Sequence, residues 1–160
     1  DPVLFLEHKH LLRQPYTRDP YPDEGYVIPF GRGRLAAEGD DLTIVTWGAT
    51  VQKSLQAVEQ GGLSADVIDL RTLVPWDQEL VAESVRKTSR VMVVHEDVRR
   101  GGFGGEIAAW IADELFWDLD APVARVAAKD CHVAYEPTLE YAILPQVEDI
   151  LDTARSLLAA

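Results

Sequence analysis

The sequence predicts an α/β fold built on a parallel, doubly wound sheet. Two apolar runs, at residues 42–47 and 65–70, are too continuously hydrophobic to leave one face in water. The segment between them places Val51, Leu55 and Val58 on one helical face, and a glycine pair at 61–62 ends it. Strand, helix and strand in this order form one βαβ unit. The rest of the chain must cover both faces of its sheet.

The chain then continues to alternate helix and strand. Pro75 stops any earlier helix, and Asp77 can cap the helix that follows it. The later predicted elements are, in order, strand 91–94, helix 106–116, strand 123–127, a polar loop at 129–135 and a helix that begins at Gln146. Ligands bind such sheets at the carboxyl ends of the strands. The residues expected at that edge are Gly48, Arg71, His95, Glu96, Asp130, Cys131 and His132.

Residues 1–40 are predicted to be an irregular lead-in, and residues 41–160 a single domain. Prolines are frequent before residue 31, with tyrosines between them, and proline blocks helix and central strand alike. One short strand is expected at residues 3–6. We expect this stiff, apolar segment to pack on the domain or on a neighbouring protein, since a solvated linker would carry more glycine and serine. The initial Asp1 suggests a piece of a longer polypeptide.

Composition and charge narrow the classes of function. The 15 basic and 27 acidic residues give a net charge of −12. This charge argues against nucleic acid or an anionic membrane as partner and favours a basic protein. No apolar run reaches about 18 residues, so no membrane span is expected. A lone cysteine cannot form an internal disulfide, which predicts a reducing, cytoplasmic compartment. Acidic residues of the last third that could meet a basic partner are Asp118, Asp120, Glu148, Asp149 and Asp152.

Two adjacent pairs carry side chains capable of catalysis. His95 and Glu96 could act as acid and base, but neighbours on an extended chain point to opposite sides. The same geometry separates Cys131 from His132, and no G-x-S-x-G elbow offers another nucleophile. The spacing therefore favours structural roles, and no catalytic residue is assigned.

Three other patterns suggest binding sites. Residues 31–36 match G-x-G-x-x-A, yet they lack the preceding strand and the long following helix of a dinucleotide site. His8 and His10 share a strand face near Glu7, whereas a zinc site needs three or four ligands. The glycine cluster at 101–105 could hold an anion ahead of a helix, or it could form a tight turn.

A series of motifs resembles one protein family over essentially the whole chain. The motifs are EHK (7–9) with Arg13, VIDLRTLVPWD (67–77), KTSR (87–90), VHE (94–96), GGEI (104–107), LDAP (119–122) with RV (125–126), and LPQ (144–146). In this order they resemble the C-terminal domain of the β subunit of 2-oxoacid dehydrogenase E1 components. Those are thiamin-diphosphate enzymes of the pyruvate and branched-chain complexes, within the wider transketolase superfamily.

The resemblance implies a three-layer α/β/α sandwich whose sheet is mostly parallel with one antiparallel edge strand. In this family a GDG motif and an Asn of the α part hold the diphosphate and magnesium. A glutamate of the domain before this one holds the pyrimidine ring. The chain has no GDG motif. No cofactor-binding or metal-binding residue is therefore expected here, and the isolated domain is expected to be inactive.

The resemblance also implies partners: a second β part, the α part of E1, and the basic peripheral-subunit-binding domain of the E2 acyltransferase. E2 docking in the family uses the acidic position of the L-D/E-A-P loop and the terminal carboxylate, here Asp120 and Ala160. The first motif places subunit-interface residues at Glu7, Lys9 and Arg13.

Two departures from the family pattern and three alternatives remain. Leu12 stands where relatives often have Tyr, and the loop at 130–135 keeps only the ends of the family pattern. The first alternative is a free-standing domain that binds an anion at residues 101–105. The others are an enzyme that uses His95 and Glu96, and the C-terminal domain of another enzyme of the transketolase superfamily.

Overall fold

Five strands form one sheet in the order β1-β3-β2-β4-β5 in the computed structural model, which describes residues 2–160. The strands are β1 (Arg34–Ala37), β2 (Leu42–Thr46), β3 (Ala65–Asp69), β4 (Val91–Val98) and β5 (Ala124–Ala128). The β2–β3, β2–β4 and β4–β5 pairs are parallel, and β1 runs antiparallel to β3 at one edge. This topology confirms the expected mostly parallel sheet with one antiparallel edge strand.

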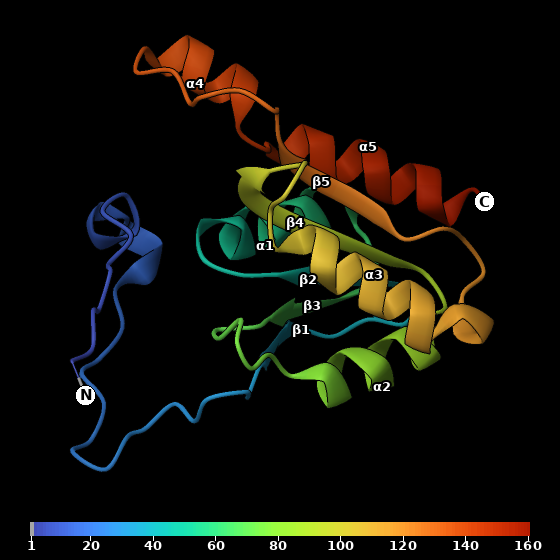
Figure 1. The fold of residues 1–160 in the computed structure, drawn as a ribbon, viewed down its shortest axis with the longest axis horizontal. Coiled ribbons are helices and arrows are strands. Elements are labelled where there is room, and N and C mark those ends of the chain that lie inside the picture. Colours follow the sequence, from blue (N-terminus) through green and yellow to red (C-terminus); the bar gives the residue numbers. More distant parts are fainter. Residues whose placement is uncertain (1) are drawn as a thin grey trace.

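Four helices cover the two faces of the sheet, which makes the predicted three-layer sandwich (Figure 1). Helices α1 (Ala49–Gly61) and α5 (Val147–Leu158) lie on one face, and α2 (Gln78–Thr88) and α3 (Gly104–Glu114) on the other. Successive side chains of β2 point to opposite faces of the sheet. Ile44 therefore packs in the core beneath α1 and α5, and Val45 in the core beneath α2 and α3. All five residues of β2 are buried.

A buried polar network ties α2 to the sheet. Asp66 of β3 is 2% exposed. It accepts hydrogen bonds from Ser84 Oγ at 2.6 Å and Lys87 Nζ at 2.7 Å. Thr43 of β2 lies 2.7 Å from the hydroxyls of both Ser84 and Thr88. The polar side chains of this network are therefore paired, as burial requires.

Helix capping follows the sequence prediction at α2. The Asp77 carboxylate accepts a hydrogen bond from the backbone N–H of Leu80 at 3.2 Å, which satisfies a free donor of the first turn. Its second oxygen accepts from the backbone N–H of Gly33 at 2.9 Å. The Asp77 side chain thus caps α2 and also holds the backbone of the segment that leads into β1.

The structure corrects the prediction in three places. The strand expected at residues 3–6 is wrong: these residues form no ladder, and their side chains are 85–90% exposed. The sheet takes in Arg34–Ala37, so the irregular lead-in ends before residue 40. Helix α4 (Pro137–Ile143), capped by Glu136, was not predicted because it buries no residue and so lacks an apolar stripe.

The lead-in, residues 2–30, forms an arm that stands away from the sandwich (Figure 1). It contains two short 3₁₀ turns, η1 (Leu11–Arg13) and η2 (Pro15–Thr17), and a third turn, η3 (Phe116–Asp118), follows α3. His8 Nε2 lies 2.9 Å from a carboxylate oxygen of Glu96, which links the arm to the end of β4. The apolar side chains of residues 3–6 do not pack on the domain. Within residues 2–160, no helix has the length and hydropathy that crossing a membrane requires.

Candidate functional site

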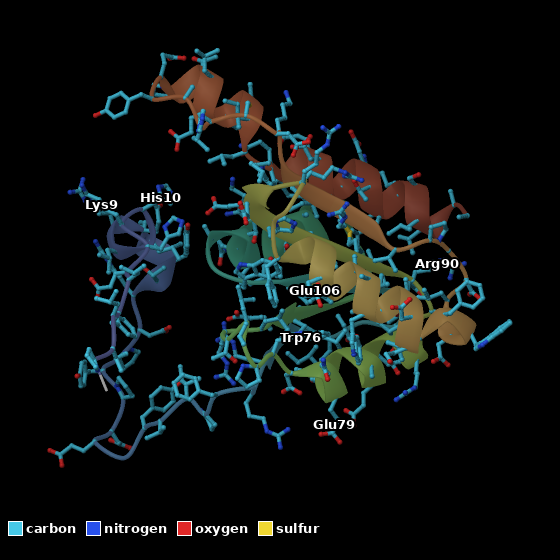
Figure 2. The ribbon with its side chains drawn as sticks, in the orientation of Figure 1. Lys9, His10, Trp76, Glu79, Arg90 and Glu106 are labelled. Atoms are coloured by element: carbon cyan, nitrogen blue, oxygen red, sulfur yellow. The ribbon has the colours of Figure 1, made fainter. Side chains whose placement is uncertain are left out.

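The two docking positions expected from the resemblance lie at the same end of the molecule. Asp120 follows η3, and its backbone N–H donates to the carbonyl of Ser89 at 2.8 Å. Its carboxylate lies 3.6 Å from Nη1 of Arg90. The Nε of Arg90 donates to the carbonyl of Leu157 in the last turn of α5 at 3.2 Å. Arg90, labelled in Figure 2, therefore connects the Asp120 loop to the helix that leads to Ala160.

Both docking positions are open to solvent. The Asp120 side chain is 61% exposed, and Ala160 is exposed as well. An ion pair this accessible contributes only about 0–1 kcal/mol to stability. The sequence analysis named Arg90 only as a member of the KTSR motif and assigned it no role. Its position directly before β4, at the end of the sheet where the LDAP loop returns, could have indicated its contact with Asp120.

A groove of about 800 Å³ opens between α3 and the loop that leads to β5. Small residues of α3 form one wall, and Phe116 and Trp117 stand at its C-terminal end with exposures of 59% and 94%. Asp120 and Arg125 also line the groove. Sequence reasoning missed it because only the large apolar stripe of α3 was considered, which faces the core. The signal was the complementary stripe of glycine and alanine.

His95 is the buried side chain at the carboxyl end of β4. It is fully buried, and within residues 2–160 neither ring nitrogen has a hydrogen-bond partner. The ring stacks on Trp47 with centroids 5.3 Å apart and planes 3° from parallel. Gly104 also lies against the ring, and a Cβ at this position would overlap it. Glycine is therefore required at the start of α3 for close packing rather than for a left-handed conformation.

Burial lowers the pKa of His95 from its ordinary value of 6.5. The Asp97 carboxylate opposes this shift, whereas the Arg125 and Arg99 guanidinium groups reinforce it. The imidazole is consequently neutral at pH 7. Glu96 is turned toward His8 of the arm rather than toward His95, so the two neighbours do not form an acid and base pair.

The other residues expected at the carboxyl edge have structural partners or none. Arg71, at φ 57°, donates to the carbonyls of Arg32 and Gly33 at 3.2 and 2.7 Å. Asp130 pairs with Arg100 at 3.1 Å. Cys131, the next residue, has an exposed thiol.

Neither the histidine pair nor the glycine cluster forms a recognisable ligand site, although His8 and His10 border a cavity of about 530 Å³ between the arm and Glu96. His8 and His10 meet edge to face, 6.2 Å between ring centroids. Over residues 2–160, no three His, Cys, Asp or Glu side chains are arranged to hold a metal ion. The glycine cluster at 101–105 has its inner side filled by the His95 ring, on which Gly102 and Gly104 pack.

The expected subunit-interface residues all lie on the arm. Glu7, Lys9 and Arg13 are exposed, and none makes an ion pair within residues 2–160. Figure 2 shows Lys9 and its neighbour His10 far from Arg90, on the opposite side of the molecule. The structure therefore separates the expected interface residues from the docking positions.

The family model described as "Transketolase, C-terminal domain" matches residues 31–150. The chain belongs to this family. This transketolase C-terminal domain is 42% identical over 159 residues to 2-oxoisovalerate dehydrogenase subunit beta 2, mitochondrial, of Arabidopsis thaliana, covering 98% of the chain and 43% of that protein. It is also 42% identical over 161 residues to pyruvate dehydrogenase E1 component subunit beta of Bacillus subtilis, covering 99% of the chain and 49% of that protein.

A solved structure described as "Split gene transketolase, inactive beta4 tetramer" has the same fold, with a TM-score of 0.68 and 28% identity. The match covers 88% of this chain and 46% of that one. These similarities confirm the resemblance to E1 β subunits. The chain spans less than half the length of each of these relatives.

The first prediction concerns Gly104. Gly104→Ala is expected to lower the free energy of unfolding by about 1–3 kcal/mol, because the new methyl group overpacks the wall between α3 and His95. Urea denaturation followed by circular dichroism measures it. Gly25→Ala, where nothing lies within 4 Å of the added Cβ, serves as the control. Equal stability of the two variants would contradict the packing described.

The second prediction concerns the pH dependence of stability. The pKa of His95 is lower in the folded chain than in the unfolded chain. Below about pH 6.5, His95 therefore binds a proton in the unfolded chain before it does so in the folded chain. The free energy of unfolding is expected to fall with decreasing pH there, by up to about 1.4 kcal/mol per pH unit from this group. His95→Phe is expected to remove this part of the slope, and His132→Asn to retain it. An unchanged slope in His95→Phe rules out the assignment.

Proposed function

We propose that this chain is the C-terminal assembly and docking domain of a thiamin-diphosphate-dependent 2-oxoacid dehydrogenase E1 component. The parent enzyme would decarboxylate a 2-oxoacid oxidatively and transfer the acyl group to a lipoyl group of E2. The observation that carries the proposal is the open Asp120 loop, linked through Arg90 to the end of α5, on a domain 42% identical to two β subunits of this enzyme class.

The cofactor belongs to other parts of the parent enzyme under this proposal. Magnesium needs several oxygen ligands, and the described residues contain no suitable cluster. A diphosphate needs an open cradle of backbone amides, whereas His95 fills the inner side of the glycine cluster. The residues present therefore do not fit thiamin diphosphate, and the domain alone is inactive.

E2 docking takes place through charge. The peripheral-subunit-binding domain is basic, and the chain carries a net charge of −12, so opposite fields favour encounter. Asp120 would accept a cation of that domain in place of Arg90. The carboxylate of Ala160, when the chain ends there, would supply a second anionic contact on the same side.

Assembly with the other E1 parts uses the arm. Its apolar side chains are exposed, with Phe5 at 87% and Phe30 at 85%, and a second β part or the α part of E1 would cover them. Glu7, Lys9 and Arg13 lie on the same segment and would make the polar contacts. The exposed thiol of Cys131 fits the reducing, cytoplasmic compartment that we propose for the chain.

The third prediction tests docking. Asp120→Lys is expected to raise the dissociation constant for the peripheral-subunit-binding domain of the cognate E2 at least about tenfold, because a repulsive charge replaces the attractive one. Isothermal titration calorimetry measures it. Glu59→Lys makes the same change of charge on α1, outside the Asp120 loop, and is expected to bind as the unaltered chain does. If both variants weaken binding equally, Asp120 contributes only through the net charge of the chain, and the proposed direct contact is contradicted.

The fourth prediction tests the absence of a cofactor site. Titration of the chain with thiamin diphosphate and Mg²⁺ is expected to give no saturable heat up to millimolar ligand, because the chain offers no matching donor set. A saturable binding heat at micromolar ligand would contradict the proposal that the cofactor site lies in other parts of the parent enzyme.

A further inference from the structure

We propose that a cavity between β5 and α5 binds a small phosphate monoester whose organic part carries hydroxyl groups. Arg99, Arg125 and Lys129 would hold the phosphate, and carboxylates of α5 would accept the hydroxyl groups. The inference goes beyond the proposed docking role and is independent of it, because neither Asp120 nor the arm lines this cavity.

The cavity has a volume of about 650 Å³ and lies beside β5, the edge strand of the sheet. Figure 1 shows α5 packed along this part of the sheet and α4 projecting beyond it. The backbone N–H of Lys129, directly after β5, donates to the carbonyl of Ile143 at the end of α4 at 3.1 Å. This contact holds the connection between α4 and α5 against the sheet, and that connection forms part of the cavity wall. Small-molecule sites in proteins have volumes of about 300–1,000 Å³, so the cavity is large enough for one.

Two guanidinium groups are fixed next to each other on the strand side of the cavity. Arg99 Nη1 donates to the backbone carbonyl of Arg125 at 2.7 Å, and Arg125 Nη1 donates to the backbone carbonyl of Arg99 at 2.9 Å. Each of these bonds uses one of the five N–H donors of a guanidinium. The pair is therefore already oriented, and its other donors can bind an anion.

The positive charge of this cluster has no counter-ion in the part of the chain that the structure describes. No carboxylate of residues 2–160 lies within 4 Å of the charged groups of Arg99, Arg125 or Lys129. Like charges held together repel each other, and the effect reaches the interior, where both arginines lower the pKa of His95. A bound anion would relieve this repulsion.

The type of anion follows from the cations. The planar fork of arginine matches the oxygen atoms of a carboxylate or a phosphate. Three cations around one cavity favour the doubly charged phosphate group over a single carboxylate. The net charge of −12 repels long polyanions, so a small ligand is expected rather than a nucleic acid.

Carboxylates of α5 line the other side of the cavity and determine the rest of the ligand. Glu148 accepts a hydrogen bond from the Tyr141 hydroxyl at 3.1 Å, and Asp152 is 81% exposed beside Arg155, 3.9 Å away. Their oxygens keep lone pairs that can accept hydroxyl groups, whereas a second phosphate would be repelled. The cavity therefore suits a molecule with a phosphate at one end and hydroxyl groups at the other.

Titration of the isotope-labelled full chain with glycerol phosphate, followed by NMR at constant ionic strength, tests the inference. Saturable shifts are expected at the amides of Arg99, Arg125 and Lys129. Arg99→Ala is expected to raise the dissociation constant about tenfold or more, because charge-assisted hydrogen bonds to the phosphate are lost. Arg18→Ala removes another exposed arginine that makes no ion pair within residues 2–160. This control is expected to bind as the unaltered chain does.

A second variant separates binding from the reciprocal bonds of the arginines. Lys129→Ala changes an exposed side chain and leaves both of those bonds in place. It is expected to raise the dissociation constant about three- to tenfold, because one cation beside the phosphate is lost. Circular dichroism verifies folding of each variant.

A pair of ligands tests the role of the carboxylates. Ethyl phosphate carries the same phosphate group without hydroxyl groups, so it is expected to bind more weakly than glycerol phosphate. Asp152→Asn is expected to reduce this difference. AMP, titrated in parallel, distinguishes a nucleotide from a smaller sugar phosphate as the source of the ligand.

Three results would overturn the inference. The first is the absence of saturable shifts with glycerol phosphate. The second is equal binding by the Arg99→Ala and Arg18→Ala chains, which would leave the arginine pair as a clamp between β5 and the end of β4. The third is equal affinity for ethyl phosphate and glycerol phosphate, which would contradict the proposed class of ligand.

Discussion

The burial of β2 and β4 on both faces is the constraint on which the rest of the structure depends. Every residue of β2 is inaccessible to water, and so are the first five residues of β4. Two strands in this condition require a helix layer on each side, which is why α1 and α5 pack on one face and α2 and α3 on the other. Polar groups on these strands must then find partners inside the protein. Thr43 finds Ser84 and Thr88, whereas His95 is covered only by Trp47 and glycine.

This constraint also determines where binding can occur. In most doubly wound sheets the carboxyl edge is the open one. Here the Trp47 and His95 rings and the glycine cluster fill the space around His95, and Arg71 is engaged with the approach to β1. The cavity that remains at this edge, about 530 Å³, is bordered by Glu96, the arm and α4. The open features lie at the periphery: the outer face of α3, the Asp120 loop and the arm.

The central fold could be predicted from the sequence because it depends on local patterns. A few neighbouring residues are enough to predict the apolar strands β2 and β3, the buried face of α1 and the Asp77 cap of α2. Strand β4 extends to Val98, past the predicted residue 94, because it resumes pairing with β5 after a register shift beyond His95. Helix α4 shows no such pattern since it buries nothing.

The candidate site was less predictable, because its parts come from distant segments. Asp120 was identified through a resemblance and not through its surroundings. Its connection to the end of α5 passes through Arg90, whose partners lie 30 and 67 positions further along the chain. The groove depends on small side chains, which a search for large apolar residues overlooks. Long-range geometry of this kind becomes visible only once the sheet order is known.

The arm has a consequence for the fate of a newly made chain. Residues 3–6 present four consecutive large apolar side chains that are exposed and have no strand partner. Unpaired backbone beside such side chains is a template for adding strands from other molecules. A chain in which this segment stays uncovered would therefore tend to aggregate through it, and any contact that covers residues 3–6 would protect it.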